Sequence, residues 1–173
     1  MELEPKPRHN GLRIGLNEHI FEKSNKANEM AKLNHMGTKN IETERLLLRK
    51  LKIDDVNDVF LIKGDITIHQ RQQCQKNIEE TILWLKYLQD IYKDNDVYHW
   101  GLELKSNNKI IGEIYQVNQL NKYKRFEIAY SINKAYWNNG YATEALCSVI
   151  KYLIKTVGYN RIEAKHYMIV QVE

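Results

Sequence analysis

The chain has 173 residues, enough for one domain with its own hydrophobic core, and its 43% apolar content argues against wholesale disorder. Its 26 basic and 22 acidic residues give a net charge of +4, spread too evenly along the chain for a nucleic-acid footprint. No apolar run approaches the ~20 residues of a membrane span, and neither the two cysteines nor the six histidines have metal-ligand spacing, which predicts a cytoplasmic protein without a metal site.

Residues 1–40 differ in pattern from the rest of the chain. They contain both prolines, Pro5 and Pro7, and show no sustained period of 2 or 3.6 residues. We therefore predict a loosely ordered N-terminal extension over residues 1–40, ahead of a folded domain over residues 41–173. Met36 would be a natural start for that domain.

The spacing of apolar residues predicts the next elements. Asn77, with Glu80 three residues later, resembles a helix-capping arrangement, and residues 118–124 form a polar connection. In chain order we predict a strand over 43–51, a helix over 55–62, a helix over 77–92, and a hairpin of strands over 97–104 and 109–117.

Residues 125–158 give the clearest pattern, which is a strand, a short turn and one long amphipathic helix. Apolar residues alternate over 125–132, as in a strand that covers a core. The chain then turns at Trp137–Ala142. An unbroken apolar stripe from Ala142 to Val157 predicts the helix, and Gly158 stands where a left-handed C-terminal cap is expected.

The turn before this helix has chemical meaning. A helix that begins after a glycine-bearing turn presents unpaired backbone N–H groups and the positive end of its dipole, which together favour a phosphate. Gly140 lets a ligand approach the backbone closely, and no Lys or Arg lies within Trp137–Thr143, so an anion would be held mainly by main-chain donors. The alternative is an ordinary strand-turn-helix link, in which Gly140 is needed only for a positive φ.

Residues 136–145, with the sequence YWNNGYATEA, resemble the acetyl-CoA signature of the GNAT N-acetyltransferase superfamily, in the branch that includes the RimJ/RimL ribosomal-protein acetyltransferases. The family pattern there is Gln/Arg-x-x-Gly-x-Gly/Ala. Stretches similar to the same branch occur in the same order at Ile41–Arg49, Ile110–Ile114 and Glu127–Tyr130, and Arg161–His166 follows as the family's fifth strand would.

This resemblance implies the acyl-CoA N-acyltransferase fold of the α/β (α+β) class, a mixed, mostly antiparallel, twisted sheet flanked by helices. In the family a further helix and a final strand pair follow the fifth strand. Because the sequence ends at Glu173, we expect a domain truncated at the C-terminus, with the last helix and strands missing.

The resemblance also implies a function, the direct transfer of an acetyl group from acetyl-CoA to a primary amine in a ternary complex. The acceptor would be a protein N-terminus or a small-molecule amine, including an aminoglycoside-type antibiotic, and the chain would act as a monomer or homodimer. Two alternatives stay open. One is an inactive or coenzyme-binding-only remnant of this fold, and the other is a ribosome- or RNA-associated module, which a steep salt dependence of RNA affinity would indicate.

The expected coenzyme site lies at the turn and at the end of the preceding strand. Backbone N–H groups of the turn would bind the diphosphate, and the extended pantetheine arm would lie along the strand. Asn138 replaces the second family glycine, and Asn tolerates left-handed geometry better than most residues. The predicted coenzyme-binding residues are Ser131, Ile132, Asn138, Asn139, Gly140, Tyr141, Ala142 and Thr143.

Glu127 is the predicted catalytic base. An amine with a pKa between ~8 and ~10.4 must lose a proton before it attacks, and a strand carboxylate could accept that proton directly or through a water molecule. Glu127 shares a strand face with Ser131 by the period of two. Alternatively, Glu127 is solvated or pairs with Arg125 or Lys109, and Glu113 on the neighbouring strand is a second candidate base.

Overall fold

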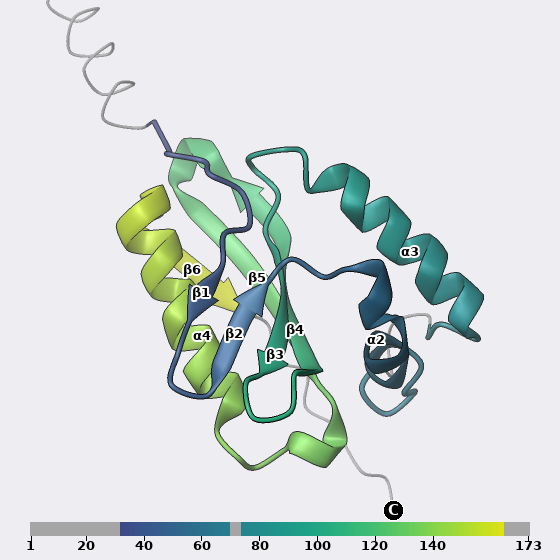
Figure 1. Ribbon diagram of the computed structural model, residues 1–173. Coiled ribbons are helices and arrows are strands. Elements are labelled where there is room, and N and C mark those ends of the chain that lie inside the picture. Colours follow the sequence, from purple (N-terminus) through teal and green to yellow (C-terminus); the bar gives the residue numbers. More distant parts are fainter. Residues whose placement is uncertain (1–31, 70–73, 165–173) are drawn as a thin grey trace, which may run out of the picture. The chain divides into compact units, whose positions relative to one another are not determined.

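Six strands form one sheet in the order β1-β2-β3-β4-β5-β6 in the computed structural model, which describes residues 32–69 and 74–164 (Figure 1). Neighbouring strands are antiparallel, except that β5 and β6 run parallel and are joined through helix α4. This is the predicted fold, a mixed and mostly antiparallel sheet flanked by helices. The strands are β1 (Ile41–Glu42), β2 (Leu46–Arg49), β3 (His99–Leu104), β4 (Lys109–Leu120), β5 (Arg125–Ile132) and β6 (Arg161–Ala164).

Helices cover both faces of the sheet, with α4 on one face and α2 and α3 on the other (Figure 1). The main helices are α2 (Val56–Lys63), α3 (Ile78–Ile91) and α4 (Tyr141–Tyr152), and α4 continues as a π-helical turn, η4 (Leu153–Val157). Three short 3-10 helices, η1 (Ile53–Asp55), η2 (Asn121–Tyr123) and η3 (Lys134–Tyr136), lie in the connections. None of the helices in the described ranges is long and apolar enough to cross a membrane.

The helix ends follow the predicted capping chemistry. The Asn77 side chain accepts a hydrogen bond from the Glu80 N–H at 2.9 Å, and the Glu80 carboxylate accepts one from the Lys76 N–H at 2.8 Å. At the other end of the chain, Gly158 adopts a φ of 99° and its N–H donates to the Leu153 carbonyl. A left-handed residue there ends the helix and directs the chain into β6.

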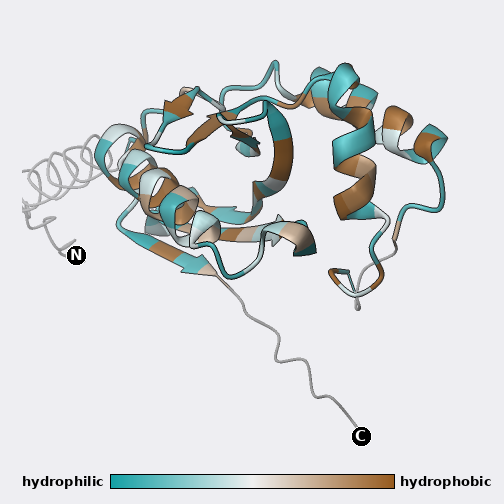
Figure 2. Cartoon of the chain, turned by 60° about the horizontal axis from the view of Figure 1, so that its bottom comes forward, coloured by the Kyte–Doolittle hydropathy of each residue, from teal (hydrophilic) through white to brown (hydrophobic). Residues whose placement is uncertain are grey.

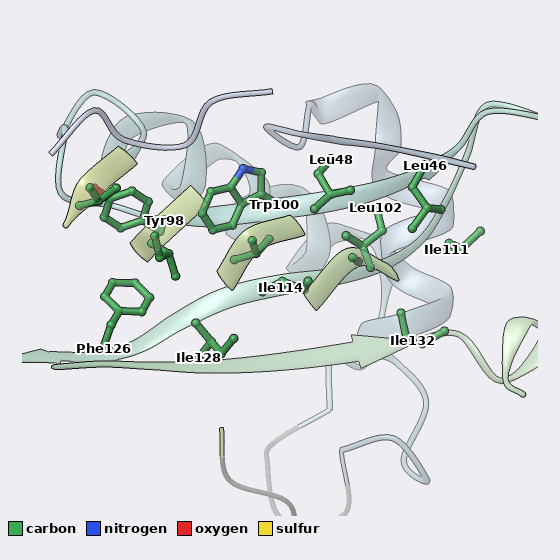
Figure 3. Packing of buried hydrophobic residues seen from close by; sticks show 14 of the residues in the cluster. Leu46, Leu48, Tyr98, Trp100, Leu102, Ile111, Ile114, Phe126, Ile128 and Ile132 are labelled. Carbon is green, nitrogen blue, oxygen red and sulfur yellow. The ribbon is translucent and has the colours of Figure 1, made fainter. Parts of the chain in front are cut away.

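The larger hydrophobic cluster lies between the sheet and α4. Figure 3 shows its side chains from β2, β3, β4 and β5 pointing into one layer. The apolar stripe of α4 and η4 closes this layer, and Figure 2 shows brown, apolar segments alternating with teal ones along these elements, as amphipathicity requires. Its fully buried members include Leu46, Leu48, Trp100, Leu102, Ile114, Phe126, Ala145, Val149 and Leu153.

The smaller cluster packs α2 and α3 against the opposite face. Its members are Leu51, Val59, Ile62, Leu85, Leu88, Tyr92 and Ile110. Because both faces of the sheet are covered, the polar side chains that remain buried between these layers stand out as candidates for function or for structural ion pairing.

Strand β4 is longer than its sequence predicts. It continues to Leu120 through a register shift between Gln116 and Asn118, and it pairs with β5 as far as Arg125. The Tyr159 hydroxyl lies 2.9 Å from oxygens of the Gln119 and Asn121 side chains. Tertiary pairing therefore holds residues in the strand that look like a polar connection in the sequence.

Residues 33–40, part of the predicted extension, contact the sheet and η4. The Trp100 indole donates to the Lys39 carbonyl at 2.7 Å, and the Thr38 hydroxyl donates to Val97 O and accepts from the His99 N–H. The Asn34 N–H donates to a carbonyl of η4. The remainder of the predicted extension, residues 1–31, lies outside the described residues.

Candidate functional site

The turn before α4 has the left-handed geometry that its sequence predicts. Gly140 adopts a φ of 77° and Asn138 a φ of 61°. A Cβ built on Gly140 would meet only the Arg45 Nη2 atom, at 3.6 Å, so this side of the turn is otherwise open. Glycine is therefore required here by its backbone conformation, and it leaves the main chain accessible to a ligand.

The first turn of α4 presents unpaired donors. The first intrahelical bond runs from the Glu144 N–H to the Gly140 carbonyl at 3.1 Å. Within residues 32–69 and 74–164, the four N–H groups of Gly140–Thr143 donate to no backbone or side-chain acceptor. Such a set at the positive end of a helix dipole suits a phosphate group.

Asn138 and Asn139 shape this turn. Asn138 is one of its residues with a positive φ. The Asn139 side chain donates to the Trp137 carbonyl at 2.8 Å. The Trp137 indole in turn donates to the Ile132 carbonyl at 2.7 Å, which ties the turn to the end of β5. Both asparagines are exposed, and so is Gly140.

A cation that local sequence reasoning missed reaches the turn from the connection between β1 and β2. The Arg45 guanidinium donates to the Asn139 carbonyl through Nη1 at 2.9 Å and stacks 4.4 Å from the centre of the Tyr141 ring. Arg45 lies 94 residues before Asn139, so nothing in the spacing of the turn points to it. The only available signal was the separate family-like stretch Ile41–Arg49.

Glu144, in the first turn of α4, holds Arg45 in place. Its carboxylate accepts hydrogen bonds from the Thr43 hydroxyl at 2.6 Å, the Arg45 N–H at 2.9 Å and the Arg45 Nε at 2.7 Å. Partial burial opposes ionisation, but these hydrogen bonds outweigh it and lower the pKa of Glu144. The hydrogen bond to Glu144 correspondingly raises the pKa of Arg45.

Within residues 32–69 and 74–164, strand β5 has one half that pairs with β6, which we call closed, and one half that does not, which we call open. Among the described residues, β6 pairs only with Arg125–Ile128, whereas β5 continues to Ile132. The Asn133 N–H donates to the Ile111 carbonyl on β4. Because backbone groups alternate along an antiparallel ladder, those of Ser131 also face β4, and those of Tyr130 and Ile132 face the open edge.

Glu127 and Ser131 are both buried, each 7% exposed, on the sheet face opposite the α4 cluster. Glu127 lies in the closed half of β5, opposite Asn118 on β4 and Glu163 on β6. Arg125 lies 3.6 Å from Glu163, and Lys109 lies 3.4 Å from Asp58. Ser131 lies in the open half, directly opposite Glu113.

Glu113 belongs to a buried charged cluster that sequence spacing did not indicate. One carboxylate oxygen lies 2.6 Å from the Lys63 Nζ, and the other lies 2.9 Å from the His99 Nε2. Burial would raise the pKa of Glu113, but the Lys63 ammonium and the His99 hydrogen bond outweigh it and lower that pKa to about 2. Burial lowers the pKa of His99, so the imidazole is neutral at pH 7.

Aromatic rings enclose the Lys63 ammonium. Its Nζ lies 4.3 Å from the centre of the Trp84 ring and 5.3 Å from that of Tyr115. His99 stacks on Tyr115 with ring centres 5.3 Å apart and meets Trp84 edge-on at 5.4 Å. We name Glu113, Trp84, Tyr115 and His99 the ammonium cage, because these groups surround one cation.

No group of three or more His, Cys, Asp or Glu side chains that could hold a metal ion occurs in the part of the chain that the structure describes. The polar groups of the site are backbone N–H groups and one guanidinium, which donate hydrogen bonds, and carboxylates on the sheet, which accept them. The site is suited to an anionic ligand at the head of α4 and to a cationic one beside Glu113.

Comparison with known proteins matches residues 45–168 to the acetyltransferase (GNAT) domain family. Among curated proteins, "Uncharacterized N-acetyltransferase YoaA" of Bacillus subtilis is 29% identical over 126 residues, which cover 72% of this chain and 71% of YoaA. A GNAT-family acetyltransferase structure from Bacillus anthracis aligns with a TM-score of 0.62 at 26% identity, over 73% of this chain and 72% of that one. The ribosomal-protein-S5-alanine acetyltransferase of Vibrio fischeri aligns with a TM-score of 0.58 at 20% identity, over 73% of each chain, and so shares the fold.

Proposed function

Because the chain belongs to the GNAT acetyltransferase family, we propose that it transfers an acetyl group from acetyl-CoA to a primary amine. The donor and the acceptor are our inference from the site. The acceptor class includes protein N-termini and small-molecule amines, and the names of the curated relatives, both N-acetyltransferases, support nitrogen as the acceptor atom.

The observation that carries this proposal is the set of unpaired N–H groups at Gly140–Thr143. They would hold the coenzyme diphosphate, with the helix dipole adding to the attraction. Arg45 extends the set, since its Nη2 atom faces the open side of Gly140. A guanidinium matches phosphate oxygens in geometry as well as in charge.

The open half of β5 would hold the pantetheine arm. The amide groups of pantetheine can form hydrogen bonds with the backbone of Tyr130 and Ile132, so that the arm continues the sheet as an added strand would. Ser131 offers its hydroxyl on the other side, next to Glu113. This arrangement would place the thioester beside the central part of β5.

The reaction needs one bond to form and one to break. The amine nitrogen attacks the thioester carbonyl carbon, a β5 backbone N–H stabilises the resulting oxyanion, and the C–S bond then breaks to release the coenzyme thiolate, which takes up a proton from solvent. Glu127, acting directly or through water, would take the proton that the amine must lose. Glu113 is the weaker candidate for this role, since a carboxylate with a pKa of about 2 is a poor proton acceptor at neutral pH.

The test combines calorimetric titration of acetyl-CoA with an assay of thiol release over a panel of amines. Gly140→Val should abolish binding, because Val at a φ of 77° is strained and its side chain covers the turn. Gly158→Val is the matched control, since Gly158 has a φ of 99° at the far end of the same helix. Equal affinity in the wild type and Gly140→Val would place the diphosphate elsewhere, and binding without thiol release for any amine would favour a coenzyme-binding remnant.

A further inference from the structure

The ammonium cage already holds a cation, the ammonium of Lys63. We propose that the cage is a second acceptor subsite, that Lys63 is its built-in occupant, and that the preferred acceptor is a diamine or polyamine whose non-reacting ammonium displaces Lys63. This inference rests on the proposed function, because it concerns the acceptor of the same reaction.

The cage has the composition of an alkylammonium site. Its carboxylate belongs to Glu113, which is 2% exposed, and two aromatic rings lie within cation-π distance of the bound Nζ. The Lys63 side chain is itself an ammonium on a straight alkyl stem, so the fold shows directly that such a group fits. The neutral His99 donates to the second Glu113 oxygen, which leaves the first oxygen for the cation.

The register of the sheet places the cage next to the reacting centre. Glu113 pairs with Ser131, in the open half of β5, and side chains of opposed residues point to the same face. Glu127 lies four residues before Ser131 on that face, roughly 13 Å along the strand at ~3.3 Å per residue. A single small amine cannot contact both carboxylates over that span, whereas an acceptor with two separated nitrogens can.

Lys63 is placed to leave the cage without disturbing the fold. It is the last residue of α2, and its side chain keeps 15% of its surface exposed. Its backbone carbonyl accepts from the Gln75 N–H at 3.1 Å, so the main chain can stay fixed while the side chain swings outward. Exchange of one ammonium for another keeps Glu113 paired, which avoids the cost of an isolated buried charge.

The first experiment compares α,ω-diaminoalkanes with amino alcohols of the same chain length as acetyl acceptors. We expect the diamines to have at least about tenfold higher kcat/KM, because only they carry a second ammonium that can occupy the cage while the other nitrogen reacts. Lys63→Ala should lower KM for the diamines, since the internal competitor is gone, and it should not lower KM for the amino alcohols to the same extent. Lys86→Ala, which removes an exposed lysine from α3, is the matched control. Equal kcat/KM for the two acceptor series, or an unchanged diamine KM in Lys63→Ala, would overturn the proposal.

The second experiment uses the unmodified protein, so it does not depend on the folding of a variant or on turnover. Reductive methylation with peptide mass spectrometry reports how exposed the Lys63 amine is. We expect a saturating diamine to increase Lys63 labelling, and the matching amino alcohol to leave it unchanged. Labelling that stays constant or falls with the diamine would overturn the proposal. Calorimetry of acetyl-CoA on the same sample shows separately whether the coenzyme site is intact, so failure of the two proposals can be told apart.

Discussion

At the scale of single residues, the carboxylates of the sheet differ in their surroundings. Glu113 is paired on both oxygens, with Lys63 and His99, and its lowered pKa keeps it ionised and weakly basic. Glu127 lies on the same face in the closed half of β5. The structure therefore divides the two candidate bases by environment, one suited to hold a cation and the other proposed to accept a proton.

Glu127→Gln should lower kcat by about a hundredfold, because it removes the proposed proton acceptor while keeping the shape of the side chain. The loss should be largest at low pH, where little of the amine is already deprotonated. Glu163→Gln is the control, since it neutralises the carboxylate opposite Glu127 on β6. A pH–rate profile of thiol release measures the fall in kcat and its dependence on pH. If Glu127→Gln and the wild type have the same profile, Glu127 is not the base.

Arg45→Gln should weaken acetyl-CoA binding about tenfold, because it removes a guanidinium that contacts the turn and its hydrogen bond to the Asn139 carbonyl. Arg45→Lys should not restore the affinity fully, since an ammonium cannot bridge Glu144 and the turn in the same way. Arg125→Gln removes a similarly exposed arginine from β5 and serves as the control. Calorimetry that gives equal affinities for Arg45→Gln and Arg125→Gln would contradict this role for Arg45.

Residue-level prediction from the sequence succeeded where the cause is local. A positive φ at Gly140 and at Asn138 follows from the conformational freedom of these two residue types, and both are confirmed. Arg45 and Lys63 could not be found in this way. Each reaches its partner across a long stretch of sequence, and a contact of that kind leaves no spacing pattern.

At the scale of elements, most strands and helices follow from apolar periodicity and capping. The Asn77 cap and the strand over 125–132 appear as predicted. The exceptions arise where tertiary contacts override the local pattern, as in the polar end of β4 and in the π-helical end of the long helix, where Gly158 bonds to Leu153.

The ammonium cage joins α3, β3 and β4, and through Lys63 also α2, and it should make their packing sensitive to acid. Glu113 has a folded-state pKa of about 2 against an ordinary value of 4.5, so its contribution is present above pH 4.5 and is lost as the pH falls toward 2. The loss amounts to about 3 kcal/mol of unfolding free energy. The lowered pKa of His99 acts in the same direction from pH 6.5 downward.

Denaturant titrations at several pH values between 7 and 2 measure this loss of unfolding free energy. This range includes the pH at which His99 and Glu113 begin to contribute. The double variant Lys63→Met/Glu113→Gln replaces the ion pair with neutral side chains of similar shape, and it should lose the part of the pH dependence that Glu113 supplies. If the unfolding free energy falls equally in the wild type and the double variant between pH 4.5 and pH 2, the folded state does not stabilise the ionised form of Glu113.

At the scale of the whole molecule, the resemblance of a few short motifs predicted the sheet, and the order of its elements brings the turn before α4 to the end of β5, where we propose the site. The pattern of the first 40 residues did not reveal that residues 33–40 contact the sheet. Those contacts are made by backbone groups, by the hydroxyl of Thr38 and by the side chains of Leu33 and His35, which are too few to form a periodic pattern.

Truncation tests how far the folded domain extends. We expect a protein that starts at Leu33 to keep the cooperative melting of the full chain. A protein that starts at Ile41 should melt at a lower temperature, because it loses the bonds made by Thr38 and the Lys39 carbonyl, each worth about 1 kcal/mol. Equal melting temperatures for the two truncated proteins, measured by calorimetry, would show that residues 33–40 do not contribute to stability.

The central claim is that backbone N–H groups at the head of α4 bind the coenzyme. The most direct measurement is an amide proton–nitrogen correlation spectrum of the labelled protein during titration with acetyl-CoA. We predict that the resonances of Gly140, Tyr141, Ala142 and Thr143 shift together and become protected from hydrogen exchange, with the same apparent Kd as calorimetry gives. Saturation with acetyl-CoA that leaves these four resonances in place would contradict the account.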